Sequence, residues 1–148
     1  MPAAEAVIEI SRPPAEVFAL LDDAPQTPLW LESCTSLEQR TPGPKAVGAA
    51  LAYAYRQGGH AGQMDGVVTA YAPAAALGMR FSDPRFSVDV DFRLAPSASG
   101  TTVQHRIGIA PRSLVGRLMS PLIQLGNRRQ VSNNLARLKR LAETPRPS

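Results

Sequence analysis

Hydrophobic and polar residues alternate along much of the chain between residues 47 and 110. In the clearest stretch the apolar positions are Phe86, Val88, Val90, Phe92 and Leu94, and the polar positions between them are Ser87, Asp89, Asp91 and Arg93. Successive side chains of a β-strand point to opposite faces of its sheet. The pattern therefore predicts a strand with one buried face and one solvated face.

Further strand patterns occur at residues 6–10, 47–55, 64–71, 77–81 and 101–110. The alanine-rich residues 45–60 are also compatible with a helix by propensity alone. The alternation there and the hairpin signal Gly58-Gly59 favour a strand followed by a turn. Short turns between consecutive strands imply one antiparallel sheet, whose apolar face needs a cover.

Prolines near the start of the chain mark where elements begin and end. Pro14 suits the first turn of a helix, whereas Pro13 before it resists the helical conformation. Pro25 ends this helix, and Pro28 begins a second short helical turn that carries Trp30. We expect one strand, two short helices, about six antiparallel strands and one long helix.

The last part of the chain changes to a helical period. From residue 112 to about residue 143, apolar residues recur mostly at spacings of three or four, at Leu114, Leu118, Leu122, Leu125, Val131, Leu135, Leu138 and Leu141. Pro121 and Gly126 should bend or divide this helix. It is the only predicted element large enough to cover the sheet, and residues 144–148 should form a frayed tail. The predicted fold class is α+β.

The order of elements resembles that of the START-like (SRPBCC, helix-grip) superfamily. The segments that carry the resemblance are IEISRPPAEVFALLDD, PLW, GPKAVGAALAY, VVTAYAPAAAL, LAPSASGTTV and NLARLKRLAE. Within it, the chain is similar to the polyketide cyclase/dehydrase and lipid-transport group. The resemblance implies a curved sheet of about seven strands around the long helix, with an apolar cavity between them. It also implies that the short helices close one end, near Trp30. Cyclases, ubiquinone-binding proteins, lipid carriers and chaperone co-factors share this scaffold, so function must be argued from the site.

The alternation predicts which side chains face such a cavity. From the sheet these are Leu51, Tyr53, Tyr55, Met64, Val68, Leu77, Met79, Phe81, Phe86, Val88, Val90, Phe92, Val103, His105 and Ile107. The long helix would add Leu118, Met119, Leu122 and Leu125, and Trp30 would lie at the closed end. This wall suits an apolar or aromatic ligand. The alternative is that these side chains simply touch one another and fill the core.

Three polar side chains on the predicted apolar face are candidates for chemistry. His105 could orient a ligand oxygen or act as a general acid or base. The alternatives are a core histidine bonded to a neighbour, or a register shift of one residue that turns it to solvent. Tyr53 and Tyr55 share one strand face and could present hydroxyls to a pocket or pack with their hydroxyls at its rim. Arg80 and Arg93 fall on the wet faces.

Length, composition and cysteine content limit the function classes. The 148 residues, 44% hydrophobic and 19% charged, fit one globular domain spanning the chain. The single Cys34 fits a reducing cytoplasm, and we see neither a secretory signal nor a membrane-spanning segment. With two histidines and no paired cysteine motif, we expect no metal site, and we expect no cofactor.

The net charge of +4 comes from bases that gather near the end of the chain, without aromatic residues between them. A solvated helix face explains them best, and we do not expect them to bind nucleic acid. Contact with an anionic membrane through Arg128, Arg129, Arg137 and Arg140 is the alternative.

Three hypotheses follow from the sequence. The leading one is a cytoplasmic binding protein whose cavity takes a lipid, an isoprenoid or an aromatic metabolite. The second is a cyclase/dehydratase-type enzyme in which His105 and Tyr53 or Tyr55 converge on one open volume and move protons. The third is a docking module for a partner or a membrane, using the basic terminal helix. The sequence does not identify the ligand or the oligomeric state.

Overall fold

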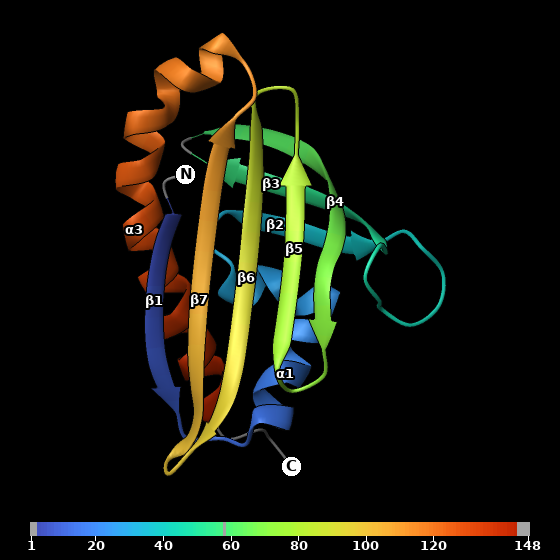
Figure 1. Ribbon diagram of the computed structural model, residues 1–148, viewed down its shortest axis with the longest axis vertical. Helices are drawn as coiled ribbons and strands as arrows, with labels where there is room; N and C mark the ends of the chain where they lie inside the picture. The colour runs from blue at the N-terminus through green and yellow to red at the C-terminus, as the bar shows by residue number, and fades with distance from the viewer. Residues whose placement is uncertain (1–2, 58, 145–148) are drawn as a thin grey trace.

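The computed structural model describes residues 3–57 and 59–144, apart from the side chains of residues 57, 60 and 120–125. Its elements, in order (Figure 1), are β1 (Ala3–Ile10), α1 (Pro14–Asp22), the 3-10 helix η1 (Ala24–Gln26), α2 (Thr27–Trp30), β2 (Cys34–Gln39), β3 (Ala50–Gln57), β4 (His60–Ala72), β5 (Ala76–Ser82), β6 (Phe86–Ser97), β7 (Gly100–Pro111) and α3 (Leu114–Glu143).

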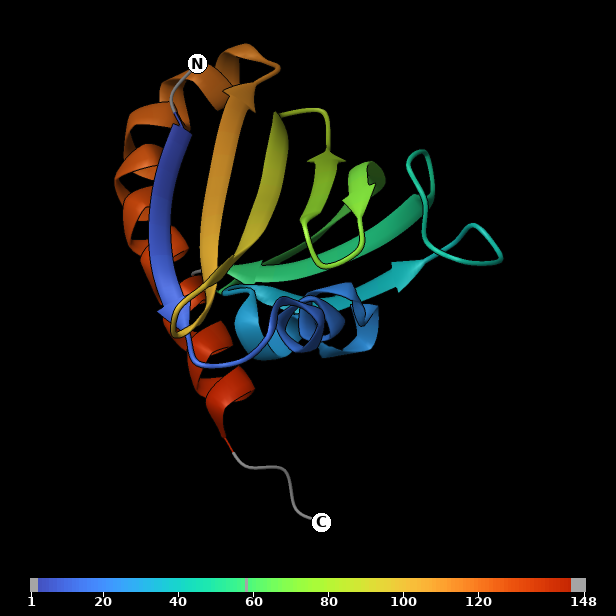
Figure 2. The same ribbon diagram turned by 60° about the horizontal axis from the view of Figure 1, so that its bottom comes forward.

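The described strands form one seven-stranded sheet with the order β1-β7-β6-β5-β4-β3-β2, and every neighbouring pair is antiparallel. Figure 2 shows that the sheet curves, with α3 along its β1 and β7 side. The short helices lie at one end, where α2 contacts both α3 and β2. This arrangement confirms the predicted α+β fold with a curved sheet and a long terminal helix.

The prolines near the start act as the sequence predicts. Pro13 is extended (φ −63°, ψ 153°) and Pro14 begins α1, which ends at Asp22. Trp30, at the end of α2, is fully buried and packs edge-on against Phe92 of β6, with ring centroids 5.2 Å apart. The short helices therefore close the sheet through a buried aromatic contact.

Helix α3 begins with a side-chain cap and continues through both of its predicted breakpoints. The Ser113 side chain accepts a hydrogen bond from the Gly116 amide, which satisfies one of the free donors of the first turn. The helix runs through Pro121 and Gly126 without dividing, and Figure 1 shows its first turns bending away from the axis of the rest. Its later turns bury Val131, Leu135 and Leu138 against the sheet.

Two details differ from the expectations for the strands. Strand β2 was not located from the sequence, because a bulge between Cys34 and Ser36 breaks its alternation and leaves Cys34 and Leu37 as its buried positions. Val47 was expected in a strand but lies before β3 and is 64% exposed. A glycine in the left-handed region, Gly48 (φ 94°), separates it from the sheet.

Candidate functional site: an apolar cavity between the sheet and the terminal helix

A cavity of about 570 Å³ lies between the sheet and α3, toward the turn that joins β5 to β6. Its walls consist of Leu31, Ser33, Tyr53, Tyr55, Met64, Phe81, Asp83, Arg85, Phe86, Val88, Val90, Ile107, Ile109, Met119, Gly126 and Gln130. Strands β3 to β7 provide most of the wall, and the segment after α2, the β5–β6 turn and α3 up to Gln130 provide the rest. Most of these residues are apolar or aromatic, and the volume is in the range of small-molecule sites.

Three stacked rings form one wall of the cavity. Alternation along β3 places Tyr53 and Tyr55 on the same face, with ring centroids 5.9 Å apart. Phe81 of β5 also stacks on Tyr53, with ring centroids 4.6 Å apart. Burial, and to a lesser extent the neighbouring Cys34 and Tyr55, raise the pKa of Tyr53 well above its ordinary value. The Tyr53 phenol is therefore neutral and can donate a hydrogen bond.

Glycines on β4 make room for these rings. Gly62 pairs with Tyr55 across the sheet, and a Cβ atom at Gly62 would lie 2.5 Å from the Tyr55 hydroxyl oxygen. Gly66 lies between Leu51 and Phe81 in the neighbouring strands, and a Cβ atom there would lie 2.6 Å from the Phe81 ring. The rings can therefore lie flat over β4 only because these positions lack side chains.

Polar groups gather at the β5–β6 turn. Arg85 donates from Nη2 to the Tyr55 hydroxyl at 3.3 Å. Asp83 accepts hydrogen bonds from the amides of Arg85 and Phe86 at 2.7 and 2.8 Å, which fixes the turn. Arg112 donates to the Asp83 carbonyl at 2.8 Å. The cavity thus has an apolar interior and a guanidinium and a phenol at one end.

His105 is fully buried and is not among the residues that line the cavity. Its ring stacks on Phe92, with centroids 4.1 Å apart and an angle of 2° between the planes. Its Nδ1 atom lies 3.2 Å from the Asp91 carbonyl oxygen, and its Nε2 atom lies 3.1 Å from the Asn134 side-chain nitrogen. The predicted apolar face of β7 is thus correct, and a shift to solvent is excluded.

The hydrogen-bond partners fix the tautomer of His105. The backbone amide of Glu32 donates to Asn134 Oδ1 at 2.8 Å, so the Asn134 amino group points at His105 and donates to Nε2. The proton of the neutral ring is then on Nδ1, which donates to the Asp91 carbonyl. Burial lowers the pKa of His105 from 6.5 to about 4, and the hydrogen bond to Asp91 opposes this effect only in part. His105 is therefore neutral at physiological pH.

Side-chain amides of α3 hold the segment that forms the cavity wall after α2. Besides the Asn134 contact, Gln130 donates to the Glu32 carbonyl at 3.2 Å and Asn133 donates to the Glu32 carboxylate at 2.9 Å. Ser33, the next residue, has a positive φ of 74°, a conformation that non-glycine residues rarely adopt. Three amides on one helix thus position a strained residue at the edge of the cavity.

The structure places the predicted ligand contacts in three groups. Those that line the cavity are Tyr53, Tyr55, Met64, Phe81, Phe86, Val88, Val90, Ile107 and Met119. Those that are buried in the core and do not line it are Trp30, Leu51, Val68, Leu77, Met79, Phe92, Val103 and His105. Leu118 is 76% exposed and faces away from it, and Leu122 and Leu125 lie outside the described side chains. The structure therefore does not bring His105 and the tyrosines together on one open volume, because packing closes the space around Phe92.

Several lining residues were not anticipated from the sequence. They are Leu31, Ser33, Asp83, Arg85, Ile109, Gly126 and Gln130. Most of them lie in turns or in the unpredicted wall after α2, where no periodic pattern indicates direction. Arg85 follows the dipeptide Asp83-Pro84, which is typical of a turn, and no sequence pattern indicates that its side chain reaches back to Tyr55 of β3.

Neither a metal cluster nor a membrane helix is found in the described parts of the chain. No group of three or more His, Cys, Asp or Glu side chains among them could hold a metal ion. No helix within the same residues is long and apolar enough to cross a bilayer.

The sequence profile of the family described as polyketide cyclase / dehydrase and lipid transport matches residues 1–143. The chain belongs to this family. The match confirms the resemblance stated above and covers nearly the whole chain. A search among curated proteins gave no match.

Solved structures share the helix-grip fold of this chain. TTHA0849 from Thermus thermophilus is 17% identical, with 95% of this chain and 97% of that chain covered and a TM-score of 0.77. The Zhui aromatase/cyclase from Streptomyces sp. R1128 is 13% identical, with 95% and 93% covered and a TM-score of 0.79. The di-domain aromatase/cyclase BexL is 16% identical, with 98% of this chain and 50% of that chain covered and a TM-score of 0.75. At these identities the likeness shows a shared fold.

Proposed function

We propose that the protein binds a hydrophobic small molecule, such as a lipid, an isoprenoid or an aromatic metabolite, in the cavity between the sheet and α3. The observation that carries this proposal is the cavity of about 570 Å³ with a largely apolar wall. The lining side chains do not fill this space. An apolar ligand that enters it leaves water and covers apolar wall, which makes binding favourable in free energy. The stacked rings of Tyr53 and Phe81 favour a flat or aromatic portion in that ligand.

We further propose that the protein acts in the cytoplasm. Its single cysteine, Cys34, is buried, and burial raises the pKa of the thiol to about 11. A buried, protonated thiol is a poor nucleophile, and this state is compatible with a reducing compartment.

The binding proposal predicts that filling the cavity weakens ligand binding. Val88→Trp would place a large ring in the cavity from its β6 wall, and we expect the affinity for an apolar fluorescent probe to fall at least about tenfold. Val7→Trp is the matched control, because Val7 is 61% exposed on β1 and lies outside the cavity. Fluorescence titration of both variants measures the difference, and thermal melting verifies that each is folded. Equal affinities in the two folded variants would disprove binding in this cavity.

A second candidate function is a cyclase/dehydratase-type enzyme. The contact between Arg85 and the Tyr55 hydroxyl at the cavity wall favours it, because a phenol beside a guanidinium can hold a ligand oxygen and exchange a proton with it. Family membership and the likeness to aromatase/cyclases are compatible with this chemistry. His105 has no part in it, because its ring nitrogens already serve the core.

The enzyme proposal predicts that Tyr55→Phe lowers turnover of a linear polyketone test compound by about a hundredfold while leaving its binding largely intact. Tyr71→Phe is the control, because the Tyr71 hydroxyl bonds to Asp22 and does not line the cavity. Product formation followed by chromatography measures the effect. If wild-type protein binds the compound and leaves it unchanged, the binding proposal stands and the enzyme proposal fails.

A further inference from the structure

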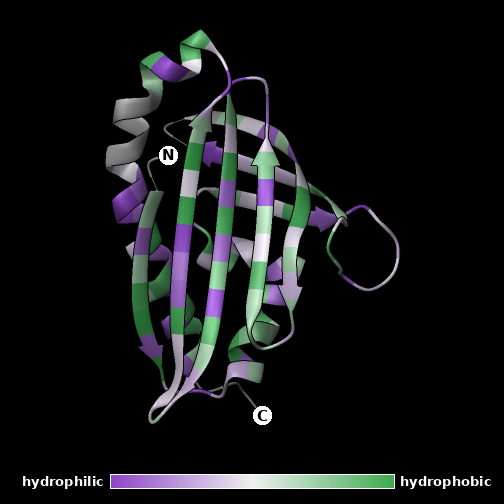
Figure 3. Ribbon diagram, in the orientation of Figure 1, coloured by the Kyte–Doolittle hydropathy of each residue, from purple (hydrophilic) through white to green (hydrophobic). Residues whose placement is uncertain are grey.

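Four apolar side chains at the start of α3 are exposed to solvent. Leu114 is 73% exposed, Val115 57%, Leu118 76% and Met119 41%. The spacing of four residues stacks Leu118 above Leu114 and Met119 above Val115, so the four share one side of the helix. Figure 3 shows hydrophobic bands, interrupted by a hydrophilic one, in these first turns at the extremity of the molecule. We call this group the apolar tip.

The first turn of α3 is anchored to the rest of the protein. Ser113 caps it, and the Arg117 amide donates to the Ser113 carbonyl at 3.0 Å. Gly116 packs against the Arg85 carbonyl so closely that a side chain at position 116 would collide with it. The helix therefore presents its buried side to the β5–β6 turn and its apolar tip outward.

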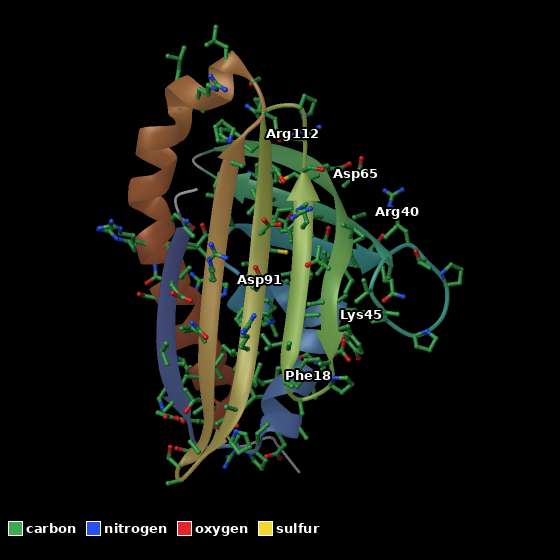
Figure 4. The ribbon with its side chains drawn as sticks, viewed as in Figure 1. Phe18, Arg40, Lys45, Asp65, Asp91 and Arg112 are labelled. Carbon is green, nitrogen blue, oxygen red and sulfur yellow. The ribbon has the colours of Figure 1, made fainter. Side chains whose placement is uncertain are left out.

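Two exposed arginines flank the apolar tip, and further bases follow along α3. Arg112 and Arg117 are exposed beside it, and Arg128 and Arg129 are exposed further along the helix. Figure 4 shows Arg112 at the end of the molecule where α3 begins. From residue 112 to residue 143 the sequence contains the bases Arg112, Arg117, Arg128, Arg129, Arg137, Lys139 and Arg140 and the single acid Glu143. Seven bases and one acid give this segment a net charge of +6.

We propose that the apolar tip and its flanking arginines dock on an anionic lipid bilayer. Exposed apolar side chains on one side of a helix, with cations beside them, can enter the boundary between headgroups and acyl chains. A second copy of the chain fits this surface less well, because a twofold contact would bring the Arg112 and Arg117 side chains of both copies together. In an anionic bilayer the leucines can contact the acyl chains, and the arginines can pair with the negatively charged headgroups.

Docking in this way brings the edge of the cavity to the bilayer. Met119 belongs to the apolar tip and also lines the cavity. Arg85, whose side chain is 39% exposed, lines the cavity from the turn that packs against Gly116. A hydrophobic molecule could therefore pass between the membrane and the cavity over a short path without crossing bulk water. The docking surface itself does not depend on what the cavity holds.

The test is cosedimentation of the full chain with vesicles of phosphatidylcholine plus phosphatidylglycerol and with vesicles of phosphatidylcholine alone. We expect binding to the anionic vesicles that weakens as salt is added. The double variant Leu114→Ser/Leu118→Ser should bind at least about tenfold more weakly, because it removes the two most exposed apolar side chains of the tip. Arg117→Gln should weaken binding about fivefold.

Matched controls use exposed residues elsewhere. Val7→Ser/Val47→Ser removes two side chains that are 61% and 64% exposed and should bind like wild type. Arg56→Gln removes an exposed arginine on β3 and should also have no effect. The proposal is overturned if the wild type does not bind the anionic vesicles or binds neutral vesicles equally well. It is also overturned if the Leu114→Ser/Leu118→Ser variant binds as tightly as wild type. A dimer, detected by light scattering, that this double variant dissociates while vesicle binding is absent would overturn it as well.

Discussion

At the scale of single residues, His105 shows how burial decides what a titratable group can do. Its Nδ1 donates to the Asp91 carbonyl, its Nε2 accepts from Asn134, and its ring stacks on Phe92. Each polar atom of the ring therefore has a partner, as a buried histidine requires. Such a ring links β6, β7 and α3 and is unsuited to moving protons to a ligand.

The state of His105 predicts how stability depends on pH. The folded protein keeps the ring neutral down to about pH 4, whereas in the unfolded chain it is protonated below its ordinary pKa of 6.5. The unfolded state thus binds more protons in this window, so stability is complete above pH 6.5 and falls as the pH drops toward 4. The loss attributable to His105 is about 3 kcal/mol in the free energy of unfolding.

Denaturant unfolding of wild type and His105→Gln across this pH window measures the effect. Subtracting the two curves removes the contribution of carboxylates, which are common to both proteins. His60→Gln, which replaces the other histidine of the chain, should retain the wild-type dependence. If His105→Gln shows the same fall in stability toward pH 4 as wild type, the account of a buried neutral His105 is wrong.

At the scale of elements, α3 serves the cavity in more than one way. Its middle turns hold Glu32 and the cavity wall through Gln130, Asn133 and Asn134, and its first turns line the cavity through Met119. Strand β3 supplies both tyrosines of the stacked wall, and β4 accommodates them with glycines. The site therefore depends on packing between α3 and strands distant in sequence.

Sequence patterns predicted the elements that have one clearly buried face. Alternation along β6 and β7 located both strands and identified the buried side of β7, including His105. Strand β2 escaped prediction because its bulge breaks the period of two. The sequence did not reveal the role of the α3 amides, because helical periodicity shows which side of the helix is apolar and not which polar partners its side chains meet. Only the structure shows that Asn134 bonds to Glu32 and His105.

Periodicity also could not separate cavity wall from core. Val88 and Phe92 share the apolar face of β6, yet Val88 lines the cavity and Phe92 is enclosed between Trp30 and His105. The difference lies in how closely other elements approach each point of the sheet. That distance is set by the curvature of the sheet and the position of the helices, which a one-dimensional pattern does not contain.

At the scale of the whole molecule, the two ends of the space under the sheet differ. Where α2 and the middle of α3 meet the sheet, Trp30, Phe92 and His105 fill the interior. Toward the β5–β6 turn the helix and sheet leave the cavity, whose edge lies beside the apolar tip of α3. The fold thus combines a solid core at one end with space for a ligand at the other.

The most direct test of ligand binding is mass spectrometry of the organic extract from freshly purified, denatured protein. We predict that wild type releases a reproducible apolar compound in near-stoichiometric amount, that Val7→Trp releases as much, and that Val88→Trp releases little. Equal recovery from Val88→Trp and wild type would contradict the claim that the ligand occupies this cavity. An empty wild-type extract, together with no uptake of an added apolar probe, would contradict ligand binding altogether.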